Sequence, residues 1–199
     1  MTDRRQKTSV RQRQIVSAAR KLIVKYGSEH VTVRRVAKEI GVSEGAIYRH
    51  FKSKRDVLSF LVDDIEVTLL KDVDENYKRD DRVLVALENV AKSHISAVEQ
   101  RRGVSFQVIA EIVSFGDKKL NKKVYDVIQK YVFRIAAILN EGVVSGEIKT
   151  DIDLEAAAKL FFSMTQGLVN VWALSNYTFK LEQKFAPIWL IYREAIARR

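Results

Sequence analysis

The scarcity of residues that interrupt helices restricts the fold of this chain more than any other feature. Its 199 residues include a single proline, Pro187, and only 8 glycines. A fold of short strands joined by tight turns needs more of both, because glycine and proline supply the turn conformations. Hydrophobic residues make up 47% of the chain, which is enough for a globular core. The sequence therefore predicts an all-α protein built from long helices.

The excess of basic residues lies entirely in the first third of the chain. Residues 1–60 hold 15 Lys and Arg against five Asp and Glu, whereas residues 61–199 hold 20 of each, so the net charge of +10 belongs to the first third. A basic head on a neutral body suits a protein whose head alone meets a polyanion. A solvated basic surface or an anionic membrane surface fits the charge equally well, so local motifs have to decide.

Local start and stop signals divide the chain into helices. Residues 1–8 show no apolar periodicity and are expected to form a mobile basic arm. Ser9 and Gln12 form a capping box that is expected to start the first helix, and Thr32 and Ser43 are expected caps of two short ones. The expected helices cover residues 9–26, 33–40, 44–50, 54–77, 83–100, 104–114, 118–144, 153–175 and 181–197.

Residues 33–52 have the pattern of two short helices that cross at a tight turn. Val36, Ala37 and Ile47 are expected inside the angle, and Ala37 is small enough to let the helices approach closely. Gly41 supplies the backbone freedom that the turn requires. The pattern is typical of a helix-turn-helix unit, whose second helix enters the major groove of DNA. Together with the local charge, it favours DNA binding over a membrane surface.

Residues 11–58 resemble the N-terminal domain of the TetR family of transcriptional regulators. The resemblance implies a three-helix helix-turn-helix DNA-binding domain at residues 1–55, including the arm at 1–8. It also implies a larger helical effector-binding and dimerisation domain at residues 56–199. The residues that carry it are Ile15, Ala18, Ala19, Leu22, Tyr26, Gly27, Thr32, Val36, Ala37, Leu58 and the ordered segment Gly41-Val-Ser-Glu-Gly-Ala-Ile-Tyr-Arg-His-Phe-Lys-Ser-Lys54.

The predicted DNA contacts lie at helix starts and on the outer side of the short third helix. Tyr48 can reach a phosphate with its hydroxyl or pack on a thymine methyl. Lys54 adds its ammonium to the N-terminus of the fourth helix, which already favours anions such as a DNA phosphate. Glu44 departs from the basic or small residue common in the family, and it can accept from a cytosine amino group or cap its own helix. The predicted set is Thr32, Val33, Arg34, Ser43, Glu44, Gly45, Ala46, Tyr48, Arg49, His50 and Lys54.

The last two expected helices are apolar around most of their circumference. We expect them to form a four-helix dimer interface with a second copy, as the family resemblance also implies, with an ordinary monomer core as the alternative. The predicted interface residues are Phe161, Met164, Leu168, Phe185, Trp189 and Tyr192.

Polar residues set among apolar ones in the middle helices suggest a ligand pocket. Each polar residue alone is better explained by a core hydrogen bond or by exposure. The resemblance implies a small-molecule effector, and the apolar surroundings favour a largely hydrophobic one. The candidate lining is His94, Phe106, Gln107, Glu111, Tyr131, Gln166, Asn170 and Trp172.

No motif points to an enzyme, the main competing class. The chain has no cysteine, no paired histidines at metal spacing, no glycine-rich phosphate loop and no Gly-x-Ser-x-Gly segment, so we predict no catalytic residues, metal or cofactor. We expect no membrane segment and a cytoplasmic location. The predicted function is a sequence-specific transcription regulator that binds a palindromic double-stranded DNA operator as a homodimer. The resemblance to the TetR family implies that it is a ligand-released repressor. The alternatives are an activator and a DNA-bound cofactor with a role outside transcription.

Overall fold

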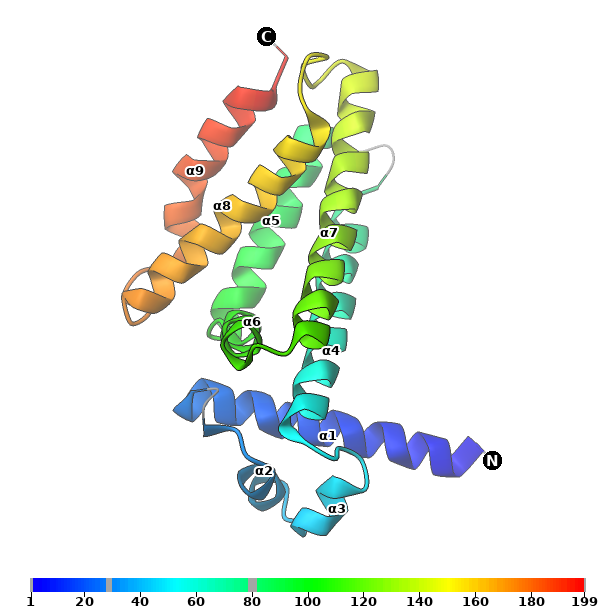
Figure 1. Ribbon diagram of the computed structural model, residues 1–199. Coiled ribbons are helices and arrows are strands. Elements are labelled where there is room, and N and C mark those ends of the chain that lie inside the picture. Colours follow the sequence, from blue (N-terminus) through cyan, green and yellow to red (C-terminus); the bar gives the residue numbers. More distant parts are fainter. Residues whose placement is uncertain (1, 28–29, 79–81, 199) are drawn as a thin grey trace. The chain divides into compact units, whose positions relative to one another are not determined.

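The computed structural model describes residues 2–27, 30–78 and 82–198. Within these ranges the secondary structure is helical apart from an isolated β-bridge between Ile148 and Ala197, which confirms the predicted all-α fold. None of the helices in these ranges is long and apolar enough to cross a membrane. The helices are α1 (Thr2–Tyr26), α2 (Val33–Glu39), α3 (Glu44–Tyr48), α4 (Lys54–Asn76), α5 (Val83–Gln100), α6 (Val104–Phe115), α7 (Lys118–Ser145), α8 (Leu154–Leu174) and α9 (Leu181–Ile196) (Figure 1).

The predicted caps start the short helices of the first third. The hydroxyl of Thr32 and that of Ser43 each accept a hydrogen bond at 3.2 Å from the backbone N–H three residues further on. At the start of α4, Ser53 accepts from the backbone N–H of Asp56, whose carboxylate accepts from the backbone N–H of Lys52. These bonds satisfy backbone donors that the first turn of a helix leaves unpaired.

The first helix begins earlier than the sequence analysis predicts. Residues 2–8, the expected mobile arm, belong to α1, which starts at Thr2. Ser9 therefore lies inside the helix, and the prediction of a capping box at Ser9 and Gln12 is wrong. The first 26 residues contain no glycine or proline, so the backbone has no local reason to leave the helix at Ser9. Gly27, with φ of 89°, follows the last helical residue, as expected.

The chain divides into two compact units. The head unit comprises residues 1–65 and 104–124, and the body unit comprises residues 66–103 and 125–199. Helices α4 and α7 contribute residues to both units, and α6 belongs to the head unit. The sequence predicts a boundary between the DNA-binding and effector-binding domains at residues 55 and 56. This functional boundary differs from the structural division and stays a prediction.

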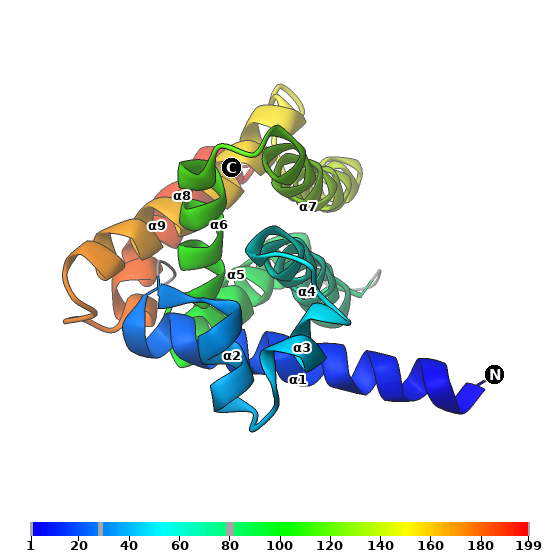
Figure 2. The same cartoon turned by 60° about the horizontal axis from the view of Figure 1, so that its bottom comes forward.

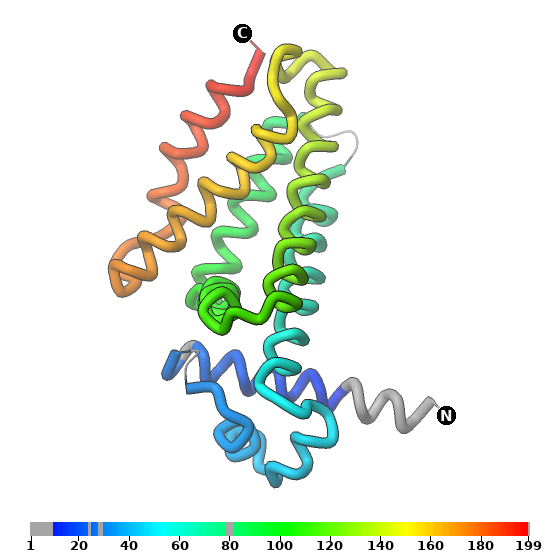
Figure 3. The backbone as a smooth tube through the Cα atoms, in the orientation of Figure 1, coloured from blue at the N-terminus to red at the C-terminus, as the bar shows by residue number. Residues whose placement is uncertain are grey.

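In the head unit, α1 packs against α2 and α6, and α2 packs against α3. Figure 2 shows α2 and α3 as two short helices, and the tube in Figure 3 follows the turn that joins them. Gly41 in that turn has φ of 68°, a left-handed conformation that favours glycine. Ile15, Ile47 and Phe51 are buried in the unit. The helix-turn-helix arrangement predicted for residues 33–52 is therefore present.

In the body unit, α8 and α9 run side by side in opposite directions and both contact α5 (Figure 1). Phe161 of α8 packs edge-on against Trp189 and Tyr192 of α9, with ring centroids 6.4 and 5.7 Å apart. The Tyr192 hydroxyl donates to the Ala157 carbonyl at 3.0 Å. Aromatic packing and one buried hydrogen bond thus join the last two helices of the chain.

Candidate DNA-binding surface and effector site

The packing of α3 determines which of its side chains reach solvent. Ile47 is completely buried, where it contributes to the core of the head unit, and Ser43, Glu44, Gly45 and Tyr48 are exposed. Tyr48 keeps 49% of its surface exposed although it is a large aromatic residue. The outer side of α3 therefore combines the small Ser43 and Gly45, which allow close approach to base edges, with the larger Glu44 and Tyr48, which can reach polar groups of DNA.

The eleven predicted DNA contacts are all accessible in the head unit. Val33, Ala46, His50 and Lys54 are half-buried, and the other seven are exposed. Gly45 leaves open space, because among the described residues a Cβ built on it meets only the Ser43 hydroxyl oxygen, at 4.0 Å. We call the exposed members the recognition surface, which consists of Thr32, Arg34, Ser43, Glu44, Gly45, Tyr48 and Arg49.

Two cations at the start of α4 are bound by carboxylates that follow much later in the sequence. Lys54 Nζ lies 2.6 Å from Glu111 Oε1, and Arg55 Nε lies 2.8 Å from Asp117 Oδ2. Asp117 also accepts from the backbone N–H groups of Lys119 and Leu120 at the start of α7, which lowers the pKa of its carboxyl. Neither pair is predictable from the sequence, since no local pattern relates residues separated by 57 or 62 positions.

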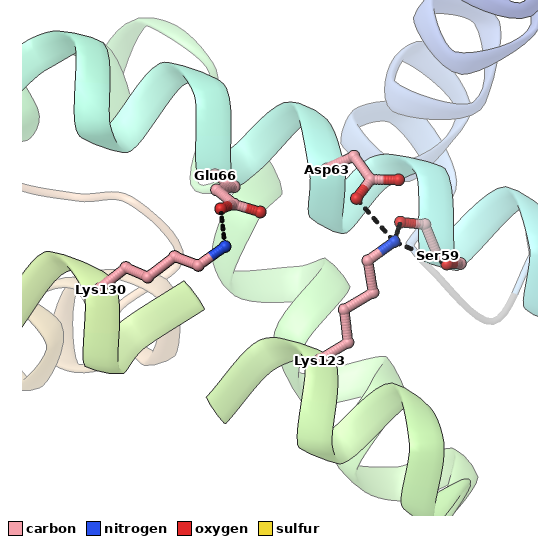
Figure 4. Close-up of polar contacts among 5 residues, drawn as sticks. All are labelled: Ser59, Asp63, Glu66, Lys123 and Lys130. Atoms are coloured by element: carbon pink, nitrogen blue, oxygen red, sulfur yellow. Dashed lines mark hydrogen bonds and ion pairs between the residues drawn. The ribbon is translucent and has the colours of Figure 1, made fainter. Parts of the chain in front are cut away.

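Further polar contacts join α4 to α7 (Figure 4). In the head unit, Lys123 Nζ lies 2.7 Å from Asp63 Oδ1 and donates to the backbone and side-chain oxygens of Ser59. In the body unit, Lys130 Nζ lies 2.5 Å from Glu66 Oε1. Each unit therefore has its own polar connection between its parts of α4 and α7.

Some of the predicted effector residues meet in the body unit. The rings of His94 on α5 and Tyr131 on α7 have centroids 6.5 Å apart, and Tyr131 packs edge-on against Phe162 of α8 at 5.9 Å. Removal from water, with a smaller effect from the charge of Arg101, lowers the pKa of His94 to about 4. Burial raises the pKa of Tyr131. His94 is therefore neutral near pH 7, and the cluster suits an apolar ligand better than an anion.

Gln166 on α8 also fits an effector site, because its Oε1 atom is buried without a hydrogen-bond partner in the part of the chain described. Trp172 is buried, but its indole N–H already donates to the Phe179 carbonyl at 2.8 Å. Asn170 is exposed, which argues against a place in a buried pocket.

The remaining predicted pocket residues, Phe106, Gln107 and Glu111, lie on α6 in the head unit. Phe106 and Gln107 are half-buried. Glu111 is bound to Lys54, so its carboxylate has a role that the pocket prediction did not anticipate.

The predicted interface residues require a correction. Phe161, Leu168, Phe185, Trp189 and Tyr192 are buried within a single chain, so they form the core of the body unit and not a contact surface. Met164 is half-buried. Both helices carry apolar residues on more than one side, and helical periodicity did not show which side packs inward. The large apolar residues exposed on these helices are Leu160, Val171 and Leu174 of α8 and Leu190 and Ile191 of α9.

The head and body both match known families. Residues 15–59 match the family described as bacterial regulatory proteins, tetR family, and residues 63–193 match the C-terminal region of YsiA-like proteins. The chain therefore belongs to the TetR family of bacterial regulatory proteins, and it is a DNA-binding transcription regulator and not an enzyme.

Relatives extend along most of the chain. The fatty acid metabolism regulator protein of Bacillus subtilis is 27% identical over 168 residues, which are 84% of this chain and 86% of that protein. A nucleoid occlusion factor SlmA from Actinobacillus pleuropneumoniae is 27% identical over 167 residues, covering 84% of this chain and 82% of SlmA.

Solved structures show the same fold. The transcriptional regulator FadR from Bacillus subtilis in complex with stearoyl-CoA has a TM-score of 0.80 and 25% identity, covering 90% of this chain and 96% of the other. A TetR transcription regulator from Haloarcula marismortui has a TM-score of 0.83 at 18% identity, covering 96% of this chain and 100% of its own.

Proposed function

We propose that this protein is a ligand-released repressor that binds a palindromic operator as a homodimer. The observation that carries the proposal is the recognition surface, where α3 is anchored by the buried Ile47 and presents Ser43, Gly45 and Tyr48 to solvent. A helix held in this way can enter a major groove with its small residues against the bases. A five-residue recognition helix makes few base contacts, so specific binding requires a second copy on a second half-site.

The outer side of α8 supports the homodimer. Leu160, Met164, Gly167, Val171 and Leu174 recur at alternating intervals of four and three residues, and all but the half-buried Met164 are exposed. This spacing is typical of a seam between two packed helices. Gly167 adds room for a partner helix, because no described residue beyond its own helix backbone and chain neighbours lies within 4 Å of a Cβ built there. The seam replaces the interface residues that the sequence analysis predicted.

The effector in this proposal is a long-chain acyl thioester. The first support is the aromatic packing of His94, Tyr131 and Phe162. The second is the buried Gln166 oxygen, which has no hydrogen-bond partner among the described residues. The third is the FadR structure that contains stearoyl-CoA. In a dimer, the separation of the two head units has to match the two operator half-sites. An effector that binds more tightly to a conformation with another separation lowers DNA affinity, and the effect grows with the difference between its affinities for the two conformations.

Selection of bound sequences from random duplex DNA by the purified protein tests the operator. A palindromic consensus whose occupancy falls on addition of stearoyl-CoA, but not of free coenzyme A, is the expected result. Binding that is indifferent to sequence and depends steeply on salt would contradict the proposal.

A role outside transcription is the second candidate, because a nucleoid occlusion factor is among the relatives. Mapping of bound sites across the genome separates the two. A few promoter sites with altered transcripts in a deletion strain support repression. Many dispersed sites without transcriptional change favour the second role, and lower transcription in the deletion strain indicates an activator.

A further inference from the structure

A lysine that is a predicted DNA contact is bound to a carboxylate of the same unit. Lys54 Nζ donates to Glu111 Oε1 at 2.6 Å, and the two side chains are 29% and 16% exposed. Lys54 is the first residue of α4, which follows the recognition helix, and Glu111 lies on α6. The pair therefore connects the start of α4 to a helix that no DNA-binding prediction includes.

The charge of Glu111 and the exposure of both side chains determine how the ion pair affects the binding of a DNA phosphate. A carboxylate and a phosphate are both anions, so Glu111 attracts the ammonium that a phosphate would bind, and it repels the phosphate itself. Both side chains keep contact with water, so the pair can open without leaving a fully buried charge. The neighbouring Arg55 is bound by Asp117 in the same way. Two cations of the basic head are thus neutralised locally.

We propose that Glu111 competes with a DNA phosphate for Lys54, so that the ion pair between α6 and the start of α4 lowers DNA affinity. While the pair is closed, DNA has to displace the carboxylate before it gains the ammonium. A shift of α6 away from α4 releases one cation to the DNA. The inference rests on the proposed role of Lys54 as a phosphate contact.

The test compares full-length wild-type protein with Glu111→Gln, using a labelled random-sequence duplex and the duplex enriched by selection. The amide keeps the size of the side chain and removes its charge. We expect binding of both duplexes to become about three- to tenfold tighter, as for a shielded ion pair. The slope of log Kd against log salt should steepen by about 0.9, the value for one added phosphate contact.

Glu155→Gln is the matched control. It removes the same charge from an ion pair with Lys159 on α8, where both side chains are exposed. We expect its DNA affinity to change by less than about twofold, because both charges of this pair are exposed and screened by salt and neither residue is a predicted DNA contact. An equal gain in this variant would mean that net charge, and not the release of Lys54, explains the result.

Lys54→Ala in both backgrounds completes the cycle. The competition predicts a larger loss of affinity in the Glu111→Gln protein than in the wild type. An equal loss in both backgrounds, or unchanged or weaker binding by a folded Glu111→Gln protein, overturns the competition alone. No loss in either background shows that Lys54 is not a phosphate contact, which removes Lys54 from the predicted DNA contacts and leaves the rest of the proposed function standing. If Glu111→Gln does not fold, Glu111→Asp decides, because its shorter carboxylate reaches Lys54 poorly and should also tighten binding.

Discussion

Gly45→Ala should stabilise the fold and weaken DNA binding, because the added methyl group favours the helix but occupies space on the recognition surface. Gly45 lies within α3, and in the described part of the chain a new Cβ meets only the Ser43 hydroxyl oxygen, at 4.0 Å. Alanine is favoured over glycine by about 0.8–1.0 kcal/mol in a helix interior. Since α3 has only five residues, we expect about half of this gain in the free energy of unfolding. The midpoint of thermal unfolding should rise by about 1–2 °C.

The same methyl group occupies space that the recognition surface leaves open for a base edge. An extra methyl in a close-packed contact costs about 1–3 kcal/mol, because the surrounding groups have to move apart. The expected loss of DNA affinity is therefore about five- to 150-fold. Fluorescence anisotropy with the selected duplex measures the affinity, and circular dichroism measures the unfolding midpoint.

Asn89→Ala on α5 is the control for this experiment. Asn89 is exposed in the body unit, and its replacement also improves helix propensity. We expect a similar rise in the unfolding midpoint with unchanged DNA affinity. If Gly45→Ala kept wild-type affinity, the outer side of α3 would not lie against the bases. A lower unfolding midpoint would instead mean that the space around Gly45 is not open.

Four other changes test other parts of the molecule. Tyr48→Ala should weaken DNA binding with little change in stability, since the ring is 49% exposed, and sedimentation should show an unchanged dimer. Phe161→Ala removes a fully buried ring that packs on Trp189, so urea titration should show a loss of about 3–5 kcal/mol. Leu174→Glu places a charge on a residue that is 85% exposed, so the monomer should fold while sedimentation shows dissociation of the dimer. The fold lowers the pKa of His94 from 6.5 to about 4, so the unfolded chain binds more protons between these values. The stability contributed by neutral His94 is therefore present above pH 6.5 and is lost as the pH falls toward about 4. The free energy of unfolding of His94→Gln should lack this pH dependence.

Helix positions and the helix-turn-helix unit were predictable because their signals are local. The hydroxyls of Thr32 and Ser43 cap the N–H groups three residues away, and Gly41 adopts the left-handed turn that its position requires. The predicted body helices agree with α5 to α9 to within a residue at each end. Local signals fail where a competing one is stronger, as at Ser9, where uninterrupted helix formers carry α1 back to Thr2.

The sequence by itself determined the class of fold, the bounds of most helices and the accessible face of α3, the predicted recognition helix. Tertiary structure decided which apolar side of α8 and α9 is buried, so that Phe161 and Trp189 are in the core and Leu174 is exposed. It also decided that Lys54 meets Glu111, a pairing of residues 57 positions apart. The physical reason is the separation in sequence of the residues that interact, because helix and cap hydrogen bonds join residues within about four positions. The partner of a side chain across two helices depends on the path of the whole chain, which no local pattern contains.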